Sequence, residues 1–144
     1  MNKKARPTVV YAIVVLTGLT ITRAQAILFL PTLQMYGGVS PNAWLAPWIT
    51  DSILGVLLPI VIYYLLNGSG VKTWALLLVY SVIGAFDYAN GLATQWLDPL
   101  PEEIAGKSLV FIALILTLTF QLTAIVLLFR KDVMAYYHDK ENSY

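Results

Sequence analysis

The sequence predicts an all-α integral membrane protein, a four-helix bundle with both the N- and C-termini in the cytoplasm. Hydrophobic residues make up 58% of the 144 residues and charged residues only 12%, and the mean hydropathy is +0.71. Soluble domains carry about 25% charged residues. The charges also avoid four apolar windows, each close to the roughly 20 residues that a helix needs to cross a bilayer. We therefore expect one transmembrane domain over residues 1–144, with spans at about 8–30, 48–66, 73–96 and 106–129.

The first window, residues 8–30, has two interpretations. Basic residues precede it, and Ala-Gln-Ala at residues 24–26 matches a small-x-small cleavage site, so a signal peptide cleaved after residue 26 is one alternative. The apolar run resumes with Ile-Leu-Phe-Leu at residues 27–30, which favours an uncleaved first span. Arg23 then lies deep inside that span.

The connection over residues 31–47 is apolar and uncharged. Prolines and glycines exclude a continuous helix through it, namely Pro31, Gly37, Gly38, Pro41 and Pro47. The connection is either a lid over a site or only a connector. Pro59 in the second window is expected to kink that helix.

The remaining spans follow from short connections. Residues 67–70 form a tight turn, so the second and third spans are antiparallel neighbours. Residues 98–103 begin another turn, and Glu102 and Glu103 stand at the start of the fourth helix. We expect Tyr136, Tyr137 and His138 to extend that helix along the interface into solvent.

The charges orient the bundle. Basic residues lie at both ends of the chain and in the 67–72 turn, whereas residues 31–47 have no charge and residues 98–107 are mainly acidic. The positive-inside rule therefore places both termini in the cytoplasm. The expected location is the plasma membrane of a prokaryote. The expected partners are the lipid bilayer and either further copies of the chain or a larger membrane complex.

Composition also excludes several classes of function. The chain has no cysteine, and its one histidine, His138, lies in the polar tail. Thiol chemistry, a thiolate metal site and a membrane haem are excluded, and no metal or other cofactor is expected. A net charge of +1 without a long basic run gives no indication of nucleic-acid binding.

One candidate site emerges from the depth of the charged residues. At 1.5 Å per residue, Arg23 and Asp87 each lie about 22 Å along their spans from the cytoplasmic side, and Asp51 lies about 6 Å below the outer surface. All three therefore fall in the outer third of a core about 30 Å thick. Tyr88 and Asn90 join this layer, and the five residues are the expected ligand- or ion-binding set.

Within this layer we expect Arg23 to pair with Asp87. Asp87 has no route to water, and a lone central aspartate costs about 2.5–3.5 kcal/mol. Arg23 could instead extend its long stem to the outer headgroups, and Asp51 could simply cap its helix. Two acids and one arginine leave one excess negative charge, so one acid should be protonated or hold a second cation.

Small residues predict where helices approach closely. Gly18, Thr22 and Ala26 recur at four-residue spacing in the first span, and Gly55 shares a helix face with Asp51 in the second. Such spacing is typical of close helix packing in membranes.

Three functional hypotheses remain open. The first is a structural or accessory membrane subunit whose Arg–Asp layer fixes helix packing or assembly. The second is a carrier or binding protein for a proton, a small cation or a small polar solute. The third is an intramembrane enzyme or receptor for a lipophilic ligand, although no catalytic motif is present and the chain is not expected to be an enzyme.

The third hypothesis also follows from a resemblance. Residues 51–81 contain an acid, Pro59, a short glycine turn, Trp74 and the pair Tyr80-Ser81. This segment, about a fifth of the chain, resembles the four-span emopamil-binding and sigma-2 receptor family. The resemblance implies a pocket for a lipophilic ligand or an isomerase. Arg23 departs from the family pattern, which favours an acid in the first span.

Overall fold

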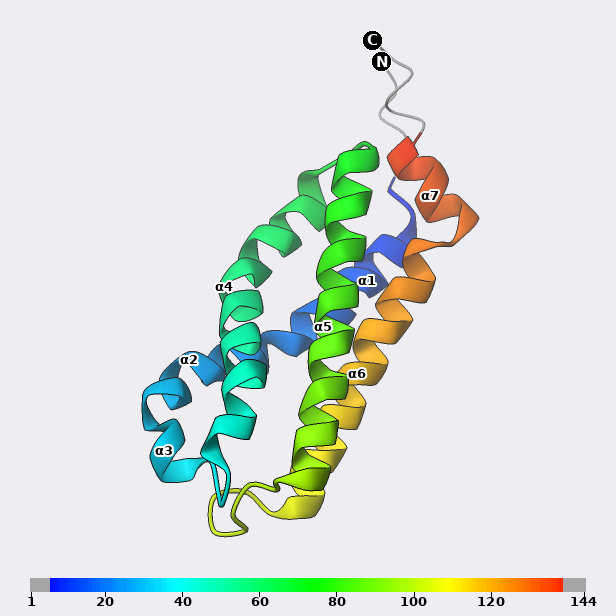
Figure 1. Ribbon diagram of the computed structural model, residues 1–144. Coiled ribbons are helices and arrows are strands. Elements are labelled where there is room, and N and C mark those ends of the chain that lie inside the picture. The colour runs from blue at the N-terminus through cyan, green and yellow to red at the C-terminus, as the bar shows by residue number, and fades with distance from the viewer. Residues whose placement is uncertain (1–5, 139–144) are drawn as a thin grey trace.

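The computed structural model describes residues 6–138, and these residues are helical with no strand. Four helical runs are long and apolar enough to cross a membrane: Thr8–Tyr36, Pro41–Asn67, Val71–Leu97 and Lys107–Leu128. The expectation of an all-helical chain with four long apolar helices is thus confirmed. The runs alternate in direction, so Arg6 and the last helix meet at one end of the molecule (Figure 1).

The first run is not one regular α-helix. It consists of α1 (Thr8–Gly18), the 3₁₀ helix η1 (Leu19–Gln25), α2 (Ala26–Phe29), η2 (Leu30–Thr32) and α3 (Leu33–Tyr36). A 3₁₀ segment of seven residues is unusual, because runs longer than 3–4 residues are uncommon. It turns about 120° rather than 100° per residue, so it changes which way each side chain points. Arg23 lies inside η1.

The connection between the first two runs is shorter than expected. Pro31 lies inside η2, and Pro47 lies inside α4 (Leu45–Asn67), which follows η3 (Pro41–Trp44). Only residues 37–40 lack helical structure. The prediction that no continuous helix runs through residues 31–47 is therefore confirmed, because residues 37–40 interrupt it. The prolines on either side lie in first turns of helices, where proline is tolerated.

α5 (Val71–Leu97) and α6 (Lys107–Leu128) complete the bundle. α4, α5 and α6 run side by side along the long axis, while α1 crosses them obliquely and contacts both α4 and α6 (Figure 1). We name the two ends of the molecule by their short helices. The α3 end contains α3, η3 and residues 98–106, and the α7 end contains Arg6, residues 68–70 and α7 (Lys131–His138).

The α7 end is closed by an apolar core. Helices α1, α4, α5, α6 and α7 all contribute buried side chains to it, among them Val10, Ile13, Leu58, Leu65, Leu77, Leu128 and Val133. α7 packs back onto the bundle rather than extending α6 into solvent, and Tyr137 is fully buried. The expectation for residues 136–138 was wrong, because the chain turns at residues 129–130 and the apolar face of α7 is buried.

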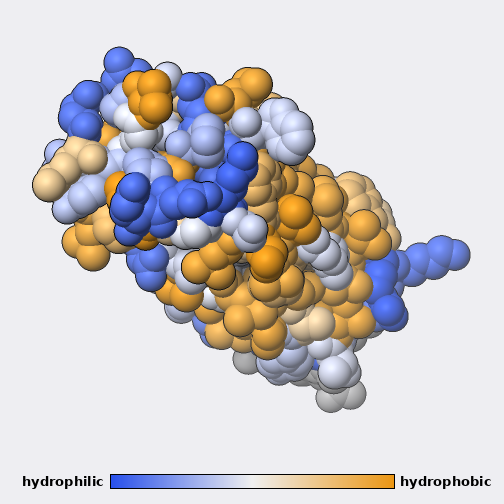
Figure 2. All heavy atoms as spheres, turned by 90° about the horizontal axis from the view of Figure 1, so that it is seen from below, coloured by the Kyte–Doolittle hydropathy of each residue, from blue (hydrophilic) through white to orange (hydrophobic). Residues whose placement is uncertain are grey.

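Much of the outer surface is apolar. Many large hydrophobic side chains are exposed along all four long runs, including Val15, Ile53, Val56, Val79, Phe86, Ile112 and Val126. Seen from the α3 end, hydrophilic residues gather over part of the end face and hydrophobic residues cover most of the remaining surface (Figure 2). Such a surface suits contact with lipid rather than with water.

Candidate functional site

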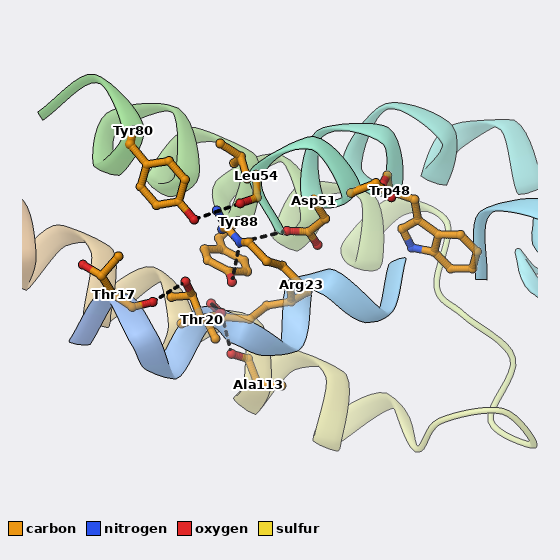
Figure 3. Close-up of polar contacts among 12 residues, drawn as sticks. Thr17, Thr20, Arg23, Trp48, Asp51, Leu54, Tyr80, Tyr88 and Ala113 are labelled. Carbon is orange, nitrogen blue, oxygen red and sulfur yellow. Dashed lines mark hydrogen bonds and ion pairs between the residues drawn. The ribbon is translucent and has the colours of Figure 1, made fainter. Parts of the chain in front are cut away.

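Arg23 connects three segments of the bundle. Its side chain is buried, with 3% of the residue exposed, and extends from η1 toward α4 and α5 (Figure 3). The Nε atom lies 3.3 Å from Asp51 Oδ1 on α4 and donates a hydrogen bond of 3.2 Å to the Tyr88 hydroxyl on α5. The guanidinium also lies over the Tyr88 ring, 4.5 Å from its centroid. It lies 5.9 Å from the centroid of the Tyr80 ring as well, so Arg23 has one charged partner and two aromatic partners.

The expected ion pair between Arg23 and Asp87 is not formed. Among the described residues the acid within ion-pair distance of Arg23 is Asp51. The depth estimate correctly placed all three residues in one layer, but depth carries no information on rotation about the helix axis. The 3₁₀ segment and the stacked ring of Tyr88 turn the guanidinium toward α4. Asp51 is the seventh residue of α4, which begins at Leu45, so it is not a helix cap.

Asp87 lies beside Asp51. It is 4% exposed, and it lines one cavity together with Asp51. Since Arg23 pairs with Asp51, Asp87 is the one of these two acids without an ion-pair partner among the described residues. Asp87 is therefore the acid that needs a proton or a second cation.

A cavity reaches this carboxyl pair from the α3 end. It has a volume of about 320 Å³ and is lined by Asp51, Asp87 and Tyr88 on one side. The other walls are mainly apolar and come from α4, α5, α6 and the 98–106 connection: Trp44, Pro47, Trp48, Gly91, Leu100, Ala105, Leu109, Val110, Ala113 and Leu114. This size is near the lower limit for pockets that bind small molecules.

A second cavity of about 320 Å³ adjoins the first. It is lined by Phe29, Tyr36, Trp48, Leu100, Ile104 and Ala105, and three of these residues also line the first cavity. Phe29 and Tyr36 belong to α2 and α3, so the segment after Arg23 forms part of the wall around the approach to the acids.

The five residues expected in the site do not all converge. Arg23, Asp51, Asp87 and Tyr88 come together as described, and Tyr88 has a second role because it lines the cavity. Asn90 is only partly buried, does not line the cavity, and has no side-chain hydrogen bond among the described residues. Asn90 follows Asp87 by three residues, but its direction around the axis of α5 puts it to one side of the face that carries Asp87 and Gly91.

The close approach that holds η1 against α4 involves Gly55 and Ala24. A Cβ atom on Gly55 would lie only 2.7 Å from Ala24 Cα, so the two backbones touch there. This contact is adjacent in sequence to Arg23 and brings its side chain within reach of Asp51. The expected stripe of Gly18, Thr22 and Ala26 does not make such a contact as a unit, since Thr22 is exposed and nothing lies within 4 Å of a Cβ on Gly18.

Several residues near the site had other expected roles. Trp44 and Trp48 resemble membrane-interface anchors in the sequence, but both line the cavity, and Trp44 Nε1 donates a hydrogen bond to the Asp98 carbonyl at 2.9 Å. Tyr80 is buried and donates to the Leu54 carbonyl at 3.1 Å. Gln121 of α6 is fully buried near Arg23. Gln121 is the only amide side chain in the fourth window, and this was the available signal for it.

The two carboxyl groups determine the chemistry that is available at this site. Within residues 6–138 there is no cluster of three or more histidine, cysteine or acidic side chains suited to a metal ion. Calcium takes 6–8 oxygen ligands, whereas the cavity offers the carboxylates of Asp51 and Asp87 and the hydroxyl of Tyr88. The arrangement can bind a proton or a singly charged group through the carboxyl pair.

Comparisons with known proteins give no family for this chain. The resemblance of residues 51–81 to the emopamil-binding and sigma-2 receptor family finds no support among them. No protein-family model, no curated protein and no solved structure matches the chain.

Proposed function

We propose that this chain is a small polytopic membrane protein that binds an organic cation, a compound with an ammonium group, in the cavity at its α3 end. The observation that carries the proposal is the cavity of about 320 Å³ with Asp51 and Asp87 in its wall. One guanidinium cannot neutralise two carboxylates, so a bound cation would balance Asp87. The proton is the alternative occupant when no other cation is present.

The walls favour an organic cation over a metal ion. Most lining residues are apolar, and they include the indole rings of Trp44 and Trp48 and the phenol of Tyr88. Aromatic faces attract ammonium groups, an interaction of roughly 0.5–2 kcal/mol. An alkyl chain on the ammonium would contact the apolar side of the cavity, whereas a hydrated metal ion would have to give up water ligands there without replacement.

The same proposal includes an orientation. With the chain inserted as a single four-span domain, the basic residues Lys72, Arg130 and Lys131 lie at the α7 end. The positive-inside rule then places the α7 end and both termini in the cytoplasm, in the plasma membrane of a prokaryote, and the cavity faces outward. Asp98, Glu102 and Glu103 belong to the 98–106 connection, whose Leu100 and Ala105 line the cavity, and they would attract cations.

The test is ligand-induced stabilisation of the purified protein. We expect n-butylammonium to raise the melting temperature of the wild type, and n-butanol, which lacks the charge, to have no comparable effect. At a hundredfold excess over Kd, a ligand that binds only the folded state adds about 2.7 kcal/mol. Asp87→Asn should lose this response, whereas Asp132→Asn, which removes an exposed acid on α7, should keep it.

An unchanged response in Asp87→Asn would contradict the proposal, as would the absence of any response in the wild type. Uptake of labelled methylammonium into proteoliposomes then separates the two forms of the proposal. Uptake that depends on Asp87 indicates a carrier, and binding without uptake indicates a binding protein.

A structural or accessory subunit is the second candidate. The specific observation in its favour is α6, whose most apolar window is only 11% buried within the chain. Such a face would pack against another copy of the chain, a partner subunit or lipid. On this alternative the Arg23–Asp51 pair serves to hold η1 against α4. Neither the wild type nor Asp87→Asn would then be stabilised by n-butylammonium.

A further inference from the structure

Two of the three nitrogen atoms of the Arg23 guanidinium take no part in the ion pair described above. Its Nε atom serves both Asp51 and Tyr88, but Nη1 and Nη2 have no hydrogen-bond partner among the described residues. A guanidinium has five N–H donors, and leaving a buried donor unpaired costs about 1–3 kcal/mol. The residue is 3% exposed, so water at the surface does not serve these donors.

Gln121 on α6 has the same deficiency, and so does Asp51 Oδ1, which contacts Arg23 only through the 3.3 Å ion pair with Nε. Gln121 is 0% exposed, and neither its Nε2 nor its Oε1 atom has a hydrogen-bond partner in the described part of the chain. The Arg23 guanidinium and the Gln121 amide both lie against Gly84. A Cβ atom on Gly84 would be 3.1 Å from Arg23 Nη1 and 3.3 Å from Gln121 Nε2.

The deficiencies of Arg23 and Gln121 are complementary. Rotation of the Gln121 amide by 180° about its terminal bond exchanges Nε2 and Oε1 and presents an acceptor to the Nη groups. Both groups come within 3.3 Å of the place that a Gly84 Cβ would occupy, so the glycine leaves that space to them. The amide is neutral, so this contact leaves the charge of Arg23 to Asp51.

We propose that Gln121 is a positioning residue that accepts a hydrogen bond from Arg23 through Oε1. This contact holds the guanidinium on the Asp51 side and away from Asp87. Asp87 thereby keeps its uncompensated carboxyl group at the cavity, where the cation of the proposed function binds. The positioning of Arg23 does not depend on that function, and only the last step rests on it.

The experiment measures which carboxyl group is protonated, with no ligand present. Dicyclohexylcarbodiimide is an apolar reagent that adds to protonated carboxyl groups in membranes, and mass spectrometry of peptides separates adducts at residues 51 and 87. We expect the wild-type adduct mainly at Asp87. In Gln121→Leu, which keeps the volume but removes the acceptor, Arg23 is free to move to Asp87, and the Asp87 adduct should fall roughly tenfold because a nearby opposite charge favours the ionised form.

Two variants distinguish positioning from a general effect on packing. Gln121→Asn keeps a neutral amide acceptor for Arg23 and should retain more of the Asp87 adduct than Gln121→Leu does. Gln95→Leu removes an equally buried glutamine on α5, whose Oε1 accepts a hydrogen bond from the Leu100 amide, and should also retain it. Size-exclusion chromatography in detergent checks that each variant folds.

Wild-type labelling of Asp87 in Gln121→Leu would overturn the proposal, and so would the absence of an Asp87 adduct in the wild type. Protection by n-butylammonium is measured in the same samples. If the variants behave as expected but n-butylammonium does not reduce the wild-type adduct, the proposed function fails and the positioning role of Gln121 stands.

Discussion

The two ends of this bundle handle buried side chains in opposite ways. The α7 end is filled by aliphatic and aromatic groups from five helices, and α7 closes it. The α3 end contains an arginine, two aspartates and a cavity that reaches both acids. Apolar packing tolerates no gap without loss of contact energy. The end with the gap is therefore the end where we place function.

Tyrosines show the same difference at the level of single residues. At the α3 end, the Tyr88 hydroxyl accepts a hydrogen bond from Arg23. At the α7 end, Tyr137 is 0% exposed and its hydroxyl has no partner among the described residues. The first tyrosine is part of a polar network, whereas the second fills space. Three substitutions test this comparison.

Removing the charge at the α3 end should have the largest effect. Arg23→Ala leaves Asp51 without its cation, and breaking a buried pair costs about 3–5 kcal/mol. We expect the lower part of that range, because the Asp51 side chain keeps 20% exposure. Thermal unfolding in detergent measures the loss. An Arg23→Ala protein that melts at the wild-type temperature would show that the ion pair does not stabilise the fold.

Disturbing the contact between η1 and α4 should give the second-largest loss of stability. In Gly55→Ala the new Cβ would lie 2.7 Å from Ala24 Cα, and forcing the backbones apart costs about 1–3 kcal/mol. Gly18→Ala in α1 is the control, because a Cβ at this helical glycine meets nothing within 4 Å. It should be neutral or stabilise by about 0.5–1 kcal/mol. Equal melting temperatures for the two variants would contradict the close approach.

At the α7 end, we expect an effect on stability only at alkaline pH. Burial raises the pKa of Tyr137 to about 12, from an ordinary value of 10.0. The unfolded state then loses its proton first, so the stabilisation is complete below pH 10.0 and declines as the pH rises toward 12. Tyr137→Phe has no such group and should lose less stability over this range. Denaturant titrations at pH 8 and at roughly pH 11 measure the difference, and parallel losses in both proteins would place Tyr137 in water.

The sequence predicted the layer of charges but not its connections. Rise per residue is nearly constant along a helix, so Arg23, Asp51 and Asp87 could be placed at one depth from their positions alone. The pairing depends on the direction of each side chain around its helix axis. The 3₁₀ segment around Arg23 changes that direction, and no pattern in the sequence predicted this segment. For this reason Arg23 was wrongly expected to pair with Asp87.

Composition and hydropathy by themselves determined four long apolar helices and the absence of thiol chemistry, because a bilayer demands about 20 apolar residues per span whatever the packing. Only the tertiary structure decided that Arg23 pairs with Asp51, that Gln121 lies beside it, and that a cavity opens onto Asp87. These features arise from how neighbouring helices are rotated against one another. Rotation is set by contacts such as Gly55 against Ala24, between residues far apart in the chain.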